Sequence, residues 1–133
     1  MTRFVIDAPT LVHVVSEGIA IHPDHQLVAP SSLRSQALGL LLTQVRAGDR
    51  TEKEARALFD PITETKVRVL GDRMSRRTAW DIARERDWAT LQHAEYLAVA
   101  RLQADALVSV DPELVAAADG VVPLAPLEAM SVP

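Results

Sequence analysis

The sequence contains no cysteine, which excludes disulfides, zinc–thiolate sites and thiol nucleophiles. No hydrophobic run approaches the roughly 20 residues that a membrane-spanning helix needs, and the first residues show no ordered signal peptide. Lysine is scarce, and the formal net charge of −4 argues against a broadly basic nucleic-acid coat. We therefore expect a cytoplasmic protein with no membrane association.

The overall amino-acid composition is typical of a folded globular chain. Of the 133 residues, 48% are hydrophobic and 24% are charged, and the mean hydropathy is +0.07. A chain of this length forms one core, because domains usually contain about 100–150 residues. The sequence therefore predicts a single domain over residues 1–133, in which residues 126–133 form a frayed tail.

Short apolar segments alternate with stretches of helical periodicity along the chain. Strands are expected over residues 3–6, 27–29, 66–70, 106–110 and 121–124. Helices are expected over 10–17, 32–47, 51–58, 72–86, 90–102 and 112–118. Strands separated by helices require crossover connections, so this order predicts a three-layer α/β/α fold with a short, mostly parallel central sheet.

Three local signals mark the expected helix ends. Thr51 and Glu54 have the spacing of a capping box, in which each residue accepts a hydrogen bond from the backbone of the other. Asp60 and Pro61 are expected to break the helix that follows. Thr90 is expected to cap the helix that begins after it.

Two aspartates stand where apolar segments end, although they are far apart in the chain. Asp7 follows the first expected strand, and Asp111 follows the segment 106–110. Parallel strands place such carboxylates at one edge of the sheet, where they can share a divalent cation with oxygen ligands, such as Mg²⁺. Aspartate is also a favoured helix N-cap, so capping is an equally open interpretation of both residues.

Four ordered blocks resemble the PIN-domain proteins, and most closely the toxins of the VapC type. The blocks are 4–8 (FVIDA), 27–33 (LVAPSSL), 93–100 (HAEYLAVA) and 107–111 (LVSVD). Each block alone is a weak signal, but their order and spacing together are fairly specific. The resemblance extends over about residues 3–127.

The resemblance implies a Mg²⁺- or Mn²⁺-dependent ribonuclease, usually paired with a small antitoxin protein and often a homodimer. It also implies a site of three or four acids. Asp7 and Asp111 match the first and last of these, whereas Gln36 and His93 stand at the positions of the other two. The implied catalytic group is therefore Asp7, Gln36, His93 and Asp111, with the two aspartates as metal ligands.

The two departures from the family pattern change the expected chemistry. Gln36 and His93 remove about two units of negative charge, and imidazole suits Mn²⁺ or Zn²⁺ better than Mg²⁺. No nearby acid is an evident replacement. Glu95 is expected on a different helix face from His93, and Glu113 reaches the site only if the turn after Asp111 bends it back.

Three functions are consistent with these observations. The first is a metal-dependent endoribonuclease that acts on single-stranded RNA with weakened or altered activity. The second is a catalytically inactive PIN-like module that binds a protein partner or RNA. The third is an unrelated doubly wound domain in which Asp7 and Asp111 are only helix caps.

A basic cluster and two tryptophans complete the candidates. Arg73, Arg76 and Arg77 can form an ordinary charged helix face or can contact phosphate. Trp80 and Trp88 are expected to be packing anchors more often than platforms for base stacking, although stacking on single-stranded RNA is physically reasonable.

Overall fold

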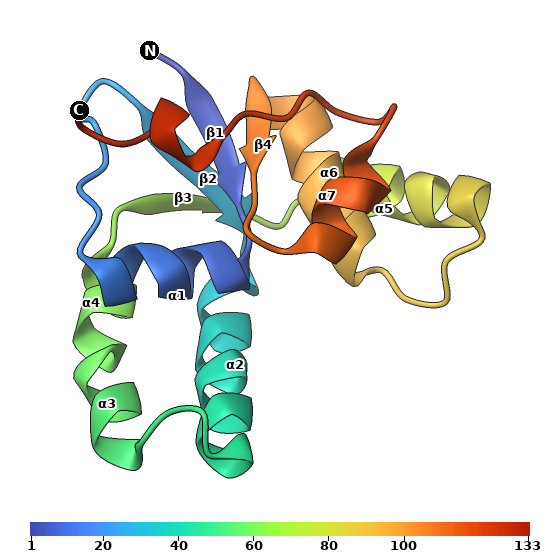
Figure 1. Ribbon diagram of the computed structural model, residues 1–133. Coiled ribbons are helices and arrows are strands. Elements are labelled where there is room, and N and C mark those ends of the chain that lie inside the picture. The colour runs from blue at the N-terminus through green and yellow to red at the C-terminus, as the bar shows by residue number, and fades with distance from the viewer.

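The computed structural model describes residues 1–133 as alternating strands and helices (Figure 1). Four strands form the sheet: β1 (Arg3–Ile6), β2 (Gln26–Pro30), β3 (Val67–Leu70) and β4 (Ala106–Val108). The α-helices are α1 (Ala8–Glu17), α2 (Leu33–Ala47), α3 (Glu52–Ala57), α4 (Phe59–Glu64), α5 (Arg73–Arg86), α6 (Gln92–Gln103) and α7 (Pro112–Ala118). A short 3₁₀ helix, η1 (Leu127–Ala129), precedes the C-terminus.

The sheet has the strand order β3-β2-β1-β4, and every pair of neighbours is parallel. Val5 in β1 lies opposite Val28 on one side and Leu107 on the other. All three of these residues are buried, as expected for strands covered on both faces. The three-layer α/β/α architecture is therefore as the sequence predicts.

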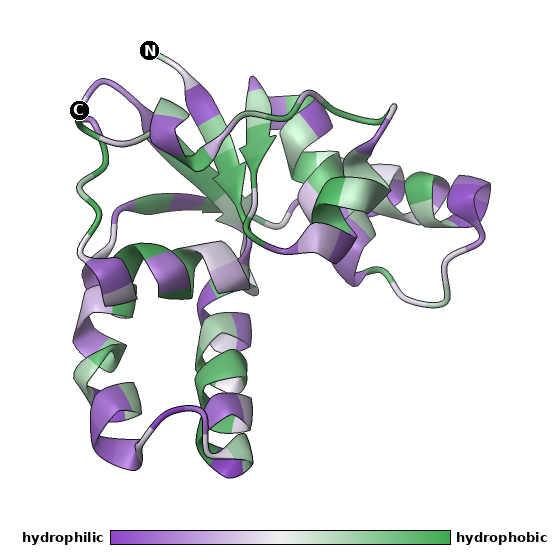
Figure 2. Ribbon diagram, in the orientation of Figure 1, coloured by the Kyte–Doolittle hydropathy of each residue, from purple (hydrophilic) through white to green (hydrophobic).

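The apolar side chains form one contiguous core of 31 buried residues around this sheet. Helix α6 packs against β1, β2 and the neighbouring helix α5. Figure 2 shows hydrophobic residues dominating the strands, whereas α3 is largely hydrophilic. None of the helices combines the length and the apolar character needed to cross a membrane.

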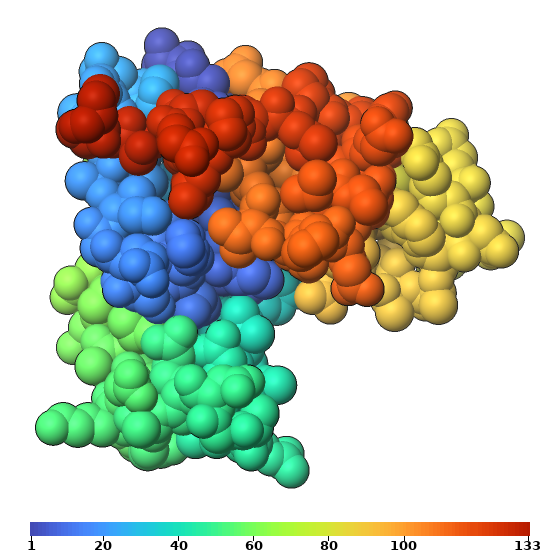
Figure 3. Space-filling view, viewed as in Figure 1, coloured from blue at the N-terminus to red at the C-terminus, as the bar shows by residue number.

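Helices α2, α3 and α4 form an arm that extends away from the sheet (Figures 1 and 3). The capping box at the start of α3 is confirmed, because Thr51 N–H donates to Glu54 Oε1 (2.9 Å) and Glu54 N–H donates to Thr51 Oγ1 (3.0 Å). Helix α3 ends at Ala57, close to the predicted residue 58, but the sequence did not predict that a further helix, α4, follows directly. Pro61 lies in the first turn of α4, where a missing backbone N–H costs no intrahelical hydrogen bond.

Two predictions near the site are also wrong in detail. Strand β4 ends at Val108, two residues earlier than predicted, because Ser109 and Val110 hydrogen-bond to the start of α1. Helix α6 begins at Gln92 after Leu91, whose side chain caps nothing, so Thr90 is not the cap. Hydrogen bonds to side chains at the start of α1 thus replace strand-to-strand hydrogen bonds at the end of β4.

The C-terminal segment is ordered, which corrects two further predictions. Residues 121–124 form no strand, although Leu124 makes an isolated parallel bridge to Leu107. Residues 126–133 are not a frayed tail. Met130 is fully buried, and its carbonyl accepts a hydrogen bond from His22 N–H (2.9 Å). The tail is therefore held by a core side chain and by backbone pairing.

Candidate functional site

Asp7 lies directly after β1 and is the N-cap of α1. Its Oδ1 accepts hydrogen bonds from the Thr10 backbone N–H (3.3 Å) and from the Thr10 hydroxyl. Its Oδ2 accepts from the Ser109 hydroxyl (2.9 Å). The side chain is only 3% exposed. The capping interpretation of Asp7 is therefore confirmed, and the carboxyl group lies inside the protein.

Ser109 connects this cap to the segment that follows β4. Its hydroxyl donates to Asp7 and accepts from the backbone N–H of Asp111 (3.0 Å). The Val110 N–H donates to the Thr10 hydroxyl (3.0 Å) and fastens the same segment to α1. The ends of β1 and β4 thus converge as predicted, with one hydroxyl group between the two aspartates.

The environment of Asp7 favours its protonated form more than water does. Burial raises the pKa of the Asp7 carboxyl, and the negative charge of Asp111 adds to the rise, whereas hydrogen bonds from Thr10 and Ser109 oppose it. Burial also raises the pKa of the Tyr96 phenol, with the nearby Asp7 carboxylate adding to the effect. Tyr96 therefore acts as a neutral hydrogen-bond donor.

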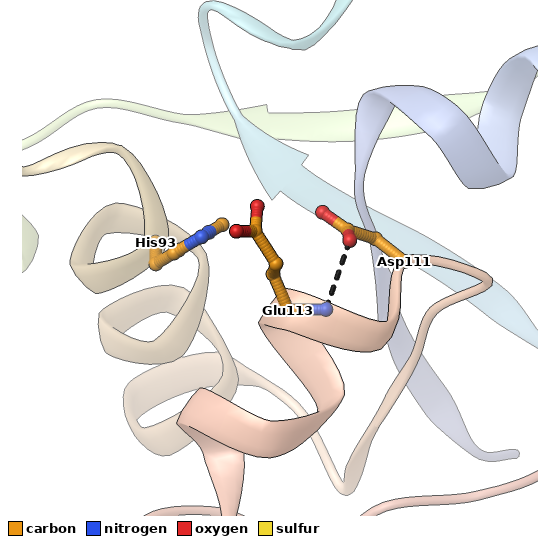
Figure 4. A group of neighbouring side chains, drawn as sticks. All are labelled: His93, Asp111 and Glu113. Carbon is orange, nitrogen blue, oxygen red and sulfur yellow. Dashed lines mark hydrogen bonds between the residues drawn. The ribbon is translucent and has the colours of Figure 1, made fainter.

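His93, Asp111 and Glu113 point toward one another beside this edge (Figure 4). They come from α6, from the turn after β4 and from the first turn of α7, and one potential ligand atom of each lies within 4.8 Å of the others. His93 and Asp111 are partly buried, and Glu113 is exposed. We call these three residues the acid–histidine cluster.

Glu113 enters the cluster because the turn after Asp111 bends back, which is the condition that the sequence left open. Asp111 is the N-cap of α7, and its Oδ1 accepts a hydrogen bond from the Glu113 N–H (3.0 Å). The signal in the sequence is an aspartate followed by proline, which favours a helix start at Pro112. That start places Glu113 in the first turn, beside its own cap.

Gln36 lies in a separate hydrogen-bonded chain. Its Oε1 accepts from the Tyr96 hydroxyl, and its Nε2 donates to Ser32 Oγ (3.2 Å). Tyr96 and His93 are three residues apart on α6 and therefore share a helix face. Gln36 makes no hydrogen bond to the acid–histidine cluster, and its side chain is held by Tyr96 and Ser32.

Glu95 faces away from the cluster, as predicted. With Ser32, Gly71 and Arg76 it lines a cavity of about 310 Å³ at the ends of β2 and β3. The carboxyl edge of the sheet therefore has two parts. The acid–histidine cluster lies at the β4 end, and this cavity lies at the β3 end.

The donors of the acid–histidine cluster suit a divalent transition ion. Ligands that bind one ion at about 2.1 Å stand at most about 4.2 Å apart. The present spacing of up to 4.8 Å therefore closes with a small side-chain movement, which the exposed Glu113 can make. One imidazole with two carboxylates favours Mn²⁺ or Zn²⁺ over Mg²⁺.

An aromatic neighbour packs against the ring of His93. Trp88 packs edge-on against it, with ring centroids 6.4 Å apart and an interplanar angle of 80°. Aromatic pairs prefer this geometry to face-to-face stacking. The imidazole is therefore supported by packing.

Comparison with known proteins supports the fold but carries no function. No protein-family model matches the chain, and no curated protein matches its sequence. Among solved structures, the chain is similar to PAE2754 from Pyrobaculum aerophilum, with a TM-score of 0.68 and 20% sequence identity. The match covers 96% of this chain and 92% of that one. At this identity the similarity shows a shared fold alone.

Proposed function

We propose that this chain is a PIN-like, divalent-metal-dependent endoribonuclease that cuts single-stranded RNA with weakened or altered activity. The observation that carries the proposal is the convergence of His93, Asp111 and Glu113 to within 4.8 Å at the carboxyl edge of the sheet. The fold and the position of Asp7 at the same edge agree with the resemblance of the sequence blocks to PIN-domain toxins.

In this proposal His93, Asp111 and Glu113 hold the ion, with Mn²⁺ preferred over Mg²⁺. A bound divalent ion activates water as a nucleophile and offsets the charge of the phosphodiester. The protein supplies the orientation of the ligands. Ser109 fixes the backbone of Asp111, and Trp88 limits the rotation of the His93 ring.

Asp7 has a positioning role in this arrangement. Both of its carboxylate oxygens accept hydrogen bonds from protein groups, and its side chain is buried. It holds Ser109, which in turn holds the turn that carries Asp111. Glu113 thereby takes the ligand position that the sequence alone gave to Asp7.

A second function is a PIN-like module that binds RNA or a protein without cutting RNA. The observation in its favour is that two of the four residues implied by the resemblance, Asp7 and Gln36, are engaged in internal hydrogen bonds. The homodimer and the small antitoxin partner implied by the same resemblance likewise remain proposals for this chain.

The test is cleavage of a labelled single-stranded RNA by the purified protein with Mn²⁺. We expect slow cleavage that EDTA stops and that Asp111→Asn abolishes. Asp49→Asn, which removes the same charge from an exposed position after α2, is the matched control and should cut like the wild type. Cleavage that persists in EDTA or in Asp111→Asn would contradict the proposal. RNA binding without cleavage under any divalent ion would establish the second function.

A further inference from the structure

Helix α5 is a basic segment in an otherwise acidic protein. Residues 73–86 contain five arginines and two acids, whereas the rest of the chain contains nine basic and sixteen acidic residues. The formal charge therefore changes sign between this helix and the remainder of the molecule. In Figure 1, α5 lies at the right of the view, away from the arm of α2, α3 and α4 at the bottom.

The exposed side chains of α5 form a stripe that combines charge with an aromatic ring. Arg73, Arg77, Trp80 and Arg84 are spaced by three or four residues, which places them on one helix face. All four are exposed, and Trp80 is 59% exposed. The stripe is about 16 Å long, at the usual rise of 1.5 Å per residue. We call it the arginine–tryptophan stripe.

The interpretation of Trp80 as a packing anchor is therefore wrong. Trp88 packs against the core, whereas the Trp80 ring is presented to solvent. The opposite face of α5 supplies the buried contacts through Ala79, Ile82 and Ala83. An aromatic ring between exposed arginines on one helix face is the combination that single-strand nucleic-acid surfaces use.

The arginines of the stripe are also free of internal partners. No ion pair involves any arginine of α5, and Arg73, Arg77 and Arg84 make no side-chain hydrogen bond. Arg76, at the edge of the stripe, donates to the Gly71 carbonyl (2.6 Å) and lines the cavity that Glu95 also lines. The stripe therefore begins at the carboxyl edge of the sheet.

We infer that the arginine–tryptophan stripe binds a single strand of RNA and leads it toward the carboxyl edge of the sheet. The arginines would neutralise successive phosphates, and Trp80 would stack on an unpaired base, which a duplex does not offer. The inference rests on the proposed function, because it names where the substrate of that site is held. It requires no cleavage and can be tested apart from it.

The test measures binding of a labelled oligouridylate of 2′-O-methyl nucleotides in EDTA, so that neither metal nor cleavage contributes. The triple variant Arg73→Gln, Arg77→Gln, Arg84→Gln should bind about tenfold or more weakly, and its salt dependence should fall by a slope of about 2. The control is Arg46→Gln, Lys53→Gln, Arg56→Gln on the α2–α3 arm, which has the same charge change. This control variant should bind the RNA within about twofold of the wild type, since the replaced residues lie outside the arginine–tryptophan stripe.

A spectroscopic readout separates stacking from charge. In a Trp88→Phe background, Trp80 is the single tryptophan, and we expect RNA to quench its fluorescence. Trp80→Ala should weaken binding about fivefold or more without changing the salt slope. All the replaced stripe residues are exposed, so thermal unfolding should remain that of the wild type.

Each other outcome overturns the inference. Equal losses in the stripe and control variants would mean non-specific attraction. If the wild-type protein does not bind the RNA in EDTA, the stripe is not an RNA-binding surface. Metal-dependent cleavage observed in the same protein would still support the nuclease proposal. Self-association that Trp80→Ala abolishes, with unchanged RNA binding, would assign the stripe to a protein contact.

Discussion

At the scale of single residues, Asp7 combines the two roles that its position in the sequence left open. It caps α1 through Thr10, and it reaches across to Ser109. The first role is predictable, because aspartate before a helix start is a common cap. The second is not, because it depends on a serine 102 residues away in the chain.

We predict that Asp7→Asn and Asp7→Ala differ sharply in stability. Asparagine can still accept from Thr10 and hydrogen-bond to Ser109, so the free energy of unfolding should stay near that of the wild type. Alanine leaves those groups without a partner and should cost about 1–3 kcal/mol. Urea unfolding in EDTA measures both, and equal losses would show that these hydrogen bonds contribute nothing.

The pH dependence of stability should carry the signature of Asp7. Its pKa in the folded protein is raised above the ordinary value of 3.8, so the folded state holds this proton more tightly than the unfolded chain does. That contribution is complete below the ordinary value and is lost as pH rises through the folded-state pKa. Relative to the wild type, Asp7→Asn should therefore gain stability as pH rises through this window. A difference independent of pH would contradict the raised pKa.

His93 should set the metal preference, because it supplies the nitrogen donor of the acid–histidine cluster. We predict that His93→Asp, which makes all donors oxygen, increases the affinity for Mg²⁺ and decreases the preference for Zn²⁺. Calorimetric titration with each ion measures the ratio. An unchanged ratio would place the metal site elsewhere.

At the scale of elements, the start of α3 follows from local sequence, whereas the starts of α4 and α6 and the ends of the sheet do not. The capping box of Thr51 and Glu54 is formed by neighbours and is predictable from spacing. The end of β4 is set by Ser109 and Val110 bonding to α1, which no local pattern encodes. Local sequence likewise does not predict that Glu113 belongs to the cluster, because this depends on the position of His93 on a different helix, α6.

Met130 shows the same limit at the C-terminus. The sequence there has the proline and small residues of a loose tail, yet the Met130 side chain is fully buried. We predict that Met130→Ala destabilises the protein by about 2–5 kcal/mol, the usual cost of such a core truncation. Val132→Ala, at a half-exposed position, is the control. Equal small losses in denaturant unfolding would mean that the tail is not part of the cooperative fold.

At the scale of the whole molecule, alternation of strands and helices was enough to predict the parallel sheet and its layers. The same alternation predicted that Asp7 and Asp111 lie at one edge of the sheet, because parallel strands have their carboxyl ends at the same edge. The division of that edge was not predictable. It arises from the helical geometry of α6, which turns His93 toward Asp111 and Glu95 toward the cavity beside β3.

The central claim is that His93, Asp111 and Glu113 bind one divalent ion, and Mn²⁺ titration calorimetry tests it most directly. The wild-type protein should bind a single Mn²⁺ ion, and Glu113→Gln should weaken that binding about tenfold or more. Glu128→Gln, with the same charge change at an exposed position outside the cluster, should bind like the wild type. Absence of Mn²⁺ binding by the wild type, or equal affinity in Glu113→Gln, would contradict the account.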